Sequence, residues 1–208
     1  GYPGNWAMTG KLLMEKYRLN IDWCLVPDLY RCIGTTRSGK HFDLRFPCGI
    51  EPFIKAMEEA VPGCEKPVRT FIELAEECSA AYDYFNDHML DGVDKKGFTY
   101  VDEGLFMKKY PNFLRMAEYP FNKVLRKIGM PEDAIDILDV YWTYIGADYE
   151  RTSFVHQAWM MLMYIKYYPA ICKRTSHELT AAGIRRLYEL GAEVWLNTKA
   201  HKVVSDDN

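Results

Sequence analysis

A long stretch of helical periodicity, from Lys66 to Leu90, dominates the chain and indicates a mainly helical fold. Its apolar side chains recur at steps of three and four residues, which places them on one face of a helix. They are Phe71, Leu74, Cys78, Tyr82 and Phe85. The segment DGVDKKGF, which begins at Asp91, interrupts the pattern with two glycines and mixed charges. We therefore predict one long amphipathic helix that buries a single face.

Prolines divide most of the remaining helical sequence into shorter pieces. Pro111 and Pro120 separate short helices between residues 105 and 129, because proline interrupts backbone hydrogen bonding. Pro131 is expected at the first position of the helix PEDAIDILDVYWTYIG, whose apolar face is Ile135, Leu138, Trp142 and Ile145. The helix ERTSFVHQAWMMLMYIKYY should end before Pro169, and its apolar run is too short to cross a bilayer. GIEPFIKAMEEAVPG predicts one further short helix.

The stretch IGTTRSGKHFDL, residues 33–44, contains GxxxxGK, the opening of a phosphate-binding P-loop. His41 stands where the motif needs Ser or Thr, and no helix follows, since HFDLRF alternates polar and apolar residues with the period of a strand. With Ser38 and Gly39 at the turn, the stretch predicts a β-hairpin. The expected fold class is therefore α+β, predominantly helical with a small antiparallel sheet.

Composition and charge exclude several classes of partner. The 208 residues carry a formal net charge of −3 and no basic stripe, so nucleic acid is not an expected partner. The six cysteines form no CxxC pair and no zinc-ligand spacing, which predicts free thiols, a cytoplasmic location and no structural metal. No transmembrane segment is expected, and peripheral membrane contact stays open.

The C-terminal part reads as a helix, a glycine turn and a strand. In SHELTAAGIRRLYELG, Ser176 is the expected N-cap and Gly191 the expected end, with a left-handed backbone. The predicted buried positions of this helix are Leu179, Ile184, Leu187 and Leu190. EVWLN, residues 193–197, is predicted to be a strand, and AHKVV, residues 200–204, a second extended piece. Since the chain starts with Gly1 and stops soon after an unpartnered strand, we expect a piece of a longer protein.

This block, ELGAEVWLNTKAHKV preceded by YYP and SHELTAAGIRRL, resembles the phytoene desaturase-like FAD-dependent oxidoreductases, the group of carotenoid desaturases, carotenoid isomerases and retinol saturase. The segments YIGADYERTSFVHQAWMMLMYIKYYP and RSGKHFDLRFP followed by GIEPFIKAMEEAVPG extend the resemblance upstream. It covers most of the chain, and its final thirty or so residues are the most specific part.

The resemblance implies a substrate-binding portion excised from a Rossmann-type flavoenzyme. Residues 1–175 would form the helical substrate domain, and residues 176–208 would return toward an FAD-binding domain that this chain lacks, since it contains no GxGxxG. Backbone atoms near Ala200, where the family usually has Val, would touch the FAD. The chain departs from the family at Lys173, Arg174 and Thr175, where many members have a Gly-Gly turn.

Candidate ligand-facing residues lie on the apolar helix before Pro169. His156 could act as an acid or base, or could be a hydrogen-bonded core histidine. The aromatic and methionine residues from Trp159 to Tyr168 could line a lipophilic tunnel or could simply pack in the core. The candidate pocket residues are His156, Trp159, Met160, Met163 and Tyr164. The catalytic residues cannot be assigned.

Other polar patterns have plainer explanations. Asp133, Asp136 and Asp139 could be imagined as a cation site, but we expect a solvated helix face. DGVDKKGF lacks the ligand spacing of an EF-hand loop. Ser176 beside His177 is adjacency in sequence and does not establish a nucleophile and its base.

The expected function is substrate binding within an FAD-dependent oxidoreductase that desaturates, saturates or isomerises C=C bonds of a hydrophobic substrate. The parent protein would be the enzyme, and this chain alone would be inactive and hold no FAD. One alternative is a non-enzymatic helical binding module for an apolar ligand or partner. Another is a parent resembling flavin amine oxidoreductases, with a polar substrate.

Overall fold

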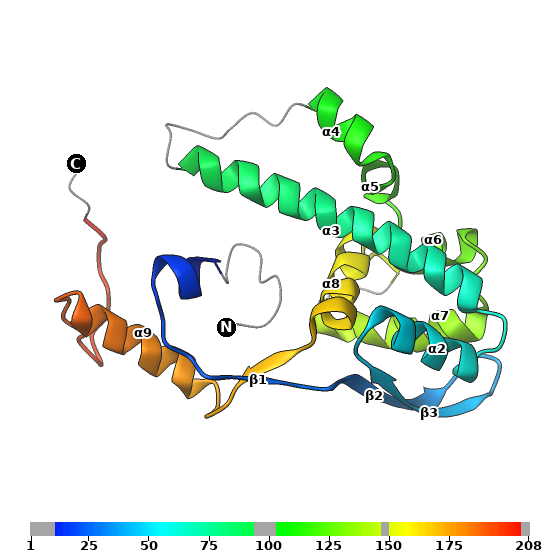
Figure 1. Cartoon of the computed structure of the whole chain (residues 1–208), viewed down its shortest axis with the longest axis horizontal. Coiled ribbons are helices and arrows are strands. Elements are labelled where there is room, and N and C mark those ends of the chain that lie inside the picture. The colour runs from blue at the N-terminus through cyan, green and yellow to red at the C-terminus, as the bar shows by residue number, and fades with distance from the viewer. Residues whose placement is uncertain (1–10, 94–102, 147–149, 205–208) are drawn as a thin grey trace.

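The computed structural model describes residues 11–93, 103–146 and 150–204, and it confirms a mainly helical α+β fold (Figure 1). The longer helices are α2 Ile50–Ala60, α3 Glu65–Val93, α7 Glu132–Asp139, α8 Phe154–Tyr167 and α9 His177–Glu189. The shorter helical pieces are η1 Lys11–Lys16, α4 Glu103–Lys109, α5 Pro111–Met116, α6 Phe121–Lys127 and η2 Val140–Tyr144. The strands are β1 Trp23–Leu25, β2 Asp28–Thr35, β3 His41–Pro47 and β4 Ala170–Cys172.

The predicted hairpin is confirmed. Strands β2 and β3 are antiparallel, with Cys32 opposite Leu44 and Thr35 opposite His41. Phe42 and Phe46 point into the core while His41, Asp43 and Arg45 are exposed, as the alternation predicted. Gly39 has φ of 88°, a backbone conformation that glycine adopts without strain. The GxxxxGK pattern is therefore a strand-to-strand turn and not a P-loop.

Helix α3 is the longest helix among the described residues, and other helices pack along it. It packs against α8, α2 and α5 (Figure 1). The rings of Phe71, Phe121 and Phe154, from three different helices, meet in the main core with centroids 5.8–6.2 Å apart. The prediction was wrong for Phe85, which is 44% exposed.

The three prolines lie at helix starts, where their missing N–H group costs no hydrogen bond. Pro111 opens α5, and Pro120 directly precedes α6. Pro131 precedes α7 instead of occupying its first position, so that prediction was off by one residue. At α5 the N–H groups of Asn112 and Phe113 donate to the Glu77 carboxylate at 2.7 and 3.1 Å. Proline spacing thus divided this region correctly.

A second sheet, absent from the prediction, joins distant parts of the chain. Strand β1 pairs with β4, with Trp23 opposite Cys172. Helix α9 lies beside the N-terminal segment in Figure 1, where Ala182 packs with Leu19 and Ile21 and Arg186 donates to the Tyr17 carbonyl at 2.9 Å. Residues 13–25 and 170–190 thus form a small unit. The predicted domain boundary after residue 175 stays a prediction.

The buried face predicted for α9 was largely wrong. Leu179, Leu187 and Leu190 are exposed, Ile184 is half-buried, and the buried residue is Ala182. The reason is that α9 contacts only a thin N-terminal segment, which covers a narrow strip of its surface. Gly191 ends the helix as expected: it has φ of 79°, and the next N–H, of Ala192, donates to the Leu187 carbonyl at 2.9 Å.

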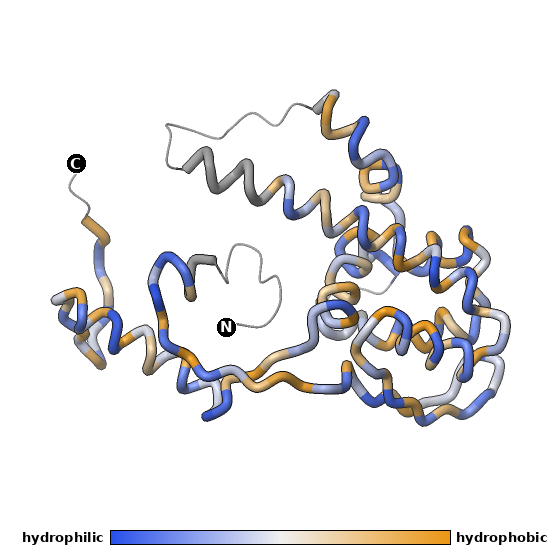
Figure 2. The backbone as a smooth tube through the Cα atoms, in the orientation of Figure 1, coloured by the Kyte–Doolittle hydropathy of each residue, from blue (hydrophilic) through white to orange (hydrophobic). Residues whose placement is uncertain are grey.

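The predicted strands at residues 193–197 and 200–204 are not formed. A turn at Leu196 and Asn197, where Asn197 has φ of 55°, interrupts the first of them. A strand needs a neighbour for its N–H and C=O groups, and no described strand lies beside this segment. Trp195 and Leu196 are consequently 72% and 77% exposed. Figure 2 shows the apolar residues at this end of the tube.

The turn before α9 contains backbone strain at Thr175. Thr175 has φ of 83°, a region that β-branched residues rarely adopt. We predict that Thr175→Gly raises the free energy of unfolding by about 1 kcal/mol, because relief of this strain exceeds the entropy that glycine adds to the unfolded chain. Denaturant titration measures the change. Ala181→Gly, at an exposed position within α9, is the control and should lose about 1 kcal/mol. A loss of stability in Thr175→Gly would refute the prediction.

Candidate functional site

Helix α8 carries all five predicted pocket residues. It is apolar on almost every side, and its buried residues are Phe154, Val155, Gln157, Ala158, Met160, Met161, Leu162 and Ile165. Trp159, Met163 and Tyr164 are half-buried, and His156 is exposed. His156, Trp159 and Met163 lie at helical spacing and share one stripe, while Met160 and Tyr164 lie on the next. The five residues therefore form two adjoining stripes, and their role in binding stays a prediction.

The first stripe continues into an aromatic surface on α3 and α5. The Trp159 ring lies 4.9 Å from the Tyr82 ring, and the Phe113 ring meets Tyr82 edge-on at 5.4 Å. His156 lies edge-on to Trp159 at 6.0 Å. Because His156 is exposed, it is not the buried core histidine that the sequence left open. Half-buried aromatic rings with an exposed imidazole beside them form an apolar wall that carries one polar group.

The second stripe leads to a cluster of tyrosines. Tyr164 donates a hydrogen bond to the Tyr144 hydroxyl at 2.5 Å. The Tyr141 ring packs on both of these rings and on Tyr30, at centroid distances of 4.7–5.8 Å. Burial raises the pKa of Tyr141 to about 12, and it raises that of Tyr164 as well. Both phenols therefore stay protonated well above neutral pH, and that of Tyr164 donates to Tyr144.

Gln157 is a feature that sequence reasoning missed. It is 1% exposed, and neither its side-chain oxygen nor its nitrogen has a hydrogen-bond partner. Among the described residues, the Tyr30 hydroxyl is also buried and without a partner. The signal in the sequence was a lone amide in an otherwise apolar helix. A buried amide without partners costs free energy, so Gln157 marks a place where stability is not optimised.

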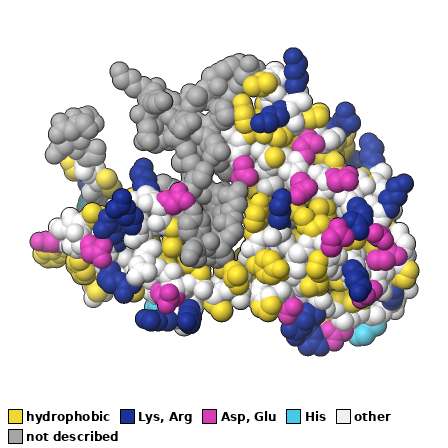
Figure 3. Space-filling model, in the orientation of Figure 1, with side chains coloured by type: hydrophobic (Ala, Val, Ile, Leu, Met, Phe, Trp, Pro, Cys, Tyr) yellow, Lys and Arg dark blue, Asp and Glu magenta, His cyan; other side chains and the backbone are white. Residues whose placement is uncertain are grey.

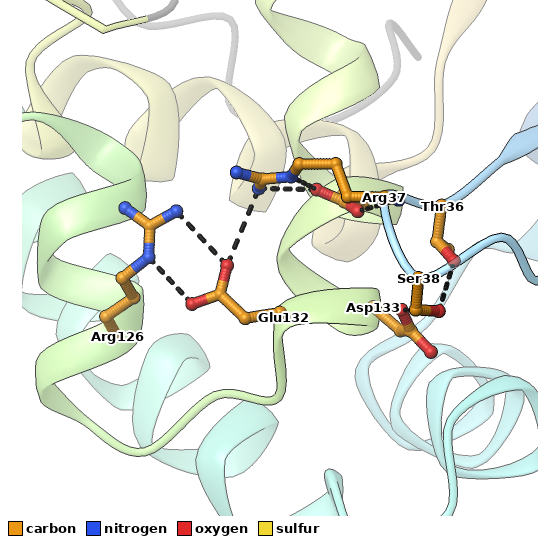
Figure 4. Close-up of polar contacts among 7 residues, drawn as sticks. Thr36, Arg37, Ser38, Arg126, Glu132 and Asp133 are labelled. Carbon is orange, nitrogen blue, oxygen red and sulfur yellow. Dashed lines mark hydrogen bonds and ion pairs between the residues drawn. The ribbon is translucent and has the colours of Figure 1, made fainter.

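The hairpin turn is fixed to α7 by a polar network (Figure 4). Arg37 donates to Asp136 through its Nε at 2.6 Å and its backbone N–H at 2.8 Å, and the Ser38 hydroxyl donates to Asp133 at 2.7 Å. The Arg126 guanidinium, from α6, pairs with Glu132 and holds the pKa of that carboxyl below its usual range. The solvated helix face predicted for these aspartates was therefore wrong, because the hairpin turn covers that face.

A surface hollow lies at the turn between α2 and α3. Its lining is Glu58, Gly63, Glu65, Lys66 and Arg69. The Glu58 carboxylate there already accepts hydrogen bonds from the N–H groups of Gly63 and Glu65, at 2.7 and 2.6 Å, and these bonds lower its pKa. This carboxylate shapes the turn that leads into α3, so we assign the hollow a structural role.

Ala200, the predicted backbone contact to FAD, is exposed in a segment without regular structure. No glycine-rich turn between a strand and a helix, the usual cradle for a dinucleotide phosphate, occurs among the described residues. The contact at Ala200 stays a prediction, and no step of chemistry is derived through the flavin.

The part of the chain that the structure describes contains no metal site and no disulfide. No group of His, Cys, Asp or Glu is placed to hold a metal ion, and all six cysteines are free. Within residues 11–93, 103–146 and 150–204, no helix is both long and apolar enough to span a bilayer. The segment DGVDKKGF, compared above with an EF-hand loop, falls largely on residues 94–98, which lie outside the described residues. The side chain of Trp142, which the sequence placed on an apolar helix face and which lies in η2, is also outside the description.

Comparison with protein-family models and with curated proteins finds no match for this chain. What the structure defines is the class: a mainly helical α+β protein with two small antiparallel sheets and an apolar helix, α8, at its centre.

Proposed function

We propose that this chain is the substrate-binding portion of an FAD-dependent oxidoreductase that acts on C=C bonds of a hydrophobic substrate by desaturation, saturation or isomerisation. In this proposal the flavin supplies the redox chemistry and is held by segments of the parent protein outside this chain. The residues of this chain shape an apolar site and exclude water from it. The chain alone is inactive.

The observation that carries the proposal is the state of residues 191–204. The helix and the left-handed glycine at Gly191 occur in the order that the resembling family has, although no strand forms after them. The large side chains of that segment are left without cover: Trp195, Leu196, Val203 and Val204 are all strongly exposed. Isolated apolar residues at a surface are normal, but four in so short a segment indicate contact with a further surface. A sheet of a flavin domain would supply that surface.

The aromatic wall of α8 supports the substrate class. Trp159 and Met163 are half-buried, the Trp159 ring packs on Tyr82, and Phe85 is exposed on the neighbouring helix. Apolar ligand sites are lined mainly by aromatic and aliphatic side chains with few polar groups. Figure 3 shows hydrophobic side chains exposed between charged ones over this larger part of the molecule.

We predict that the parent protein, expressed from its whole reading frame, retains a flavin absorption spectrum through gel filtration. The 208-residue chain mixed with FAD should emerge without it. In the parent, Leu196→Asp should lower the ratio of flavin to protein, because a charge would be buried between the segment and the flavin domain. Leu114→Asp, at an exposed leucine on α5, is the matched control and should leave the ratio unchanged.

Two outcomes would overturn this proposal. A colourless, folded parent would favour the alternative, a helical binding module that uses the same aromatic wall without a flavin. Tight, stoichiometric FAD binding by the 208 residues alone would show that the flavin site lies within this chain.

A further inference from the structure

Asp139, the last residue of α7, carries a carboxyl group whose surroundings disfavour its ionised form. It is only 8% exposed, whereas Asp133 and Asp136 on the same helix are half-buried and bonded to the hairpin turn. The carbonyl end of a helix carries partial negative charge, which opposes a carboxylate there. Burial therefore combines with the helix end to disfavour ionisation of Asp139.

The charged groups around Asp139 come from three elements. The hairpin contributes Arg37, α6 contributes Arg126, and α7 itself contributes Asp136 and Glu132. The two guanidinium groups attract the carboxylate form, while the two acidic groups repel it. Arg37 binds Asp136. As Figure 4 shows, Arg37 also reaches Glu132, at 3.5 Å, and Arg126 binds Glu132 at 2.7 Å. Both cations thus bind other carboxylates, and burial, the largest effect, outweighs their attraction and raises the pKa of Asp139 to about 6.

The position of Asp139 links this network to the tyrosine cluster. η2 begins at the next residue, and its Tyr141 and Tyr144 rings pack against Tyr164 of α8. A change in charge at Asp139 therefore acts where α7 passes into the segment that holds these rings. α8 is anchored in the core by the fully buried Phe154, whereas η2 packs on that core through the partly buried Tyr141 and follows Asp139 directly in the chain.

We propose that Asp139 makes the junction between α7 and η2 a pH-sensitive latch. The latch is closed while the carboxyl is neutral, and it loosens when the carboxyl ionises, so that η2 and its tyrosines separate from α8 as the pH rises to neutral. An ionised carboxylate lowers its free energy by reaching water, and local opening of η2 gives it that access. The latch does not depend on the proposed flavoenzyme function.

The direction follows from linkage. The folded-state pKa of Asp139, about 6, lies above 3.8, the usual pKa of an exposed aspartate. The closed form therefore holds the proton more tightly than the open form, and its advantage is complete below the lower value. That advantage is lost as the pH rises through the higher value. The population of the open form should then increase about tenfold to thirtyfold between about pH 4.5 and pH 7.5.

Amide hydrogen exchange in the whole chain tests the latch. After correction for intrinsic exchange rates, the N–H groups of residues 140–146 should lose protection by that factor as the pH rises. In Asp139→Asn, which is neutral at every pH, their protection should stay within about threefold. Asp133→Asn, which keeps Asp139, is the control and should follow the unmodified chain.

Denaturant titration of the same three proteins gives a second measurement. The unmodified chain and Asp133→Asn should lose stability over this pH range relative to Asp139→Asn. Equal pH dependence of protection at residues 140–146 in the unmodified chain and in Asp139→Asn would overturn the proposal. Loss of protection spread evenly over α3 and α8 would overturn it as well, because the latch is local.

Discussion

Replacing Phe154 with alanine is expected to lower the free energy of unfolding by about 3–5 kcal/mol. Phe154 is fully buried at the start of α8, and its ring stacks on Phe121 at 5.8 Å and meets Phe71 edge-on at 6.2 Å. These rings come from α6 and α3, so the truncation opens a cavity where three helices meet. The loss combines the transfer free energy of the ring with the cost of a cavity that rigid helices cannot close.

Denaturant-induced unfolding followed by circular dichroism measures this change. Phe85→Ala is the control: Phe85 is 44% exposed on α3, and its truncation should cost less than about 1 kcal/mol. Since total stability of a domain is about 5–15 kcal/mol, Phe154→Ala could prevent folding altogether. Phe154→Leu, which keeps most of the volume, then provides the comparison and should cost about 1–2 kcal/mol. Equal losses in Phe85→Ala and Phe154→Ala would contradict the described core.

Replacing Gln157 with methionine is expected to raise the free energy of unfolding by about 1–3 kcal/mol. The Gln157 amide is buried with neither of its polar atoms hydrogen-bonded, so the folded state bears its full desolvation cost. Methionine has a similar length and an adaptable shape, and it has no strong polar group to satisfy. The substitution should therefore keep the packing of α8 and remove the penalty.

Gln157→Glu is the opposing variant for the same site. At neutral pH it would place a charge where the structure offers no partner, so it should lower stability, and the loss should diminish in acid as the carboxyl becomes neutral. Thermal unfolding of the three proteins at two pH values measures both effects. A loss of stability in Gln157→Met would contradict the expectation and would mean that the amide is hydrogen-bonded in the native protein.

Features that depend on neighbours in sequence were predicted well. The hairpin at Gly39, the breaks at Pro111 and Pro120, and the end of α9 at Gly191 are all confirmed. Each depends on the backbone preferences of one or two residues, and these preferences act whatever the rest of the chain does. The long amphipathic helix was also predicted, because its periodicity extends over many turns.

Features that depend on distant residues were missed. Strands β1 and β4 have three residues each, too few to show a pattern, and they form because they meet each other. The segment at 193–197 shows the opposite case: its pattern is that of a strand, but the described chain offers it no partner. A strand is completed by its neighbour, so sequence alone could not decide either case.

The candidate site likewise has features that the sequence predicted and features that it could not predict. The apolar character of α8 was evident from its composition, and so was the set from His156 to Tyr164. That His156 is exposed, that Gln157 is buried without partners and that Asp139 is buried near two ion pairs could not be read from spacing. Helical periodicity places residues on a face, but it does not say which other element covers that face.

The amino-acid sequence by itself therefore determined that prolines separate the short helices, that a glycine follows α9, where the hairpin turns and which helix is most apolar, because these follow from local backbone preference and residue periodicity. Only the tertiary structure decided which faces are covered, as with the aspartates of α7 under the hairpin turn and the leucines of α9 left exposed. The physical reason is that burial, and with it the cost of a carboxyl or an amide, is a property of the elements that meet around a residue.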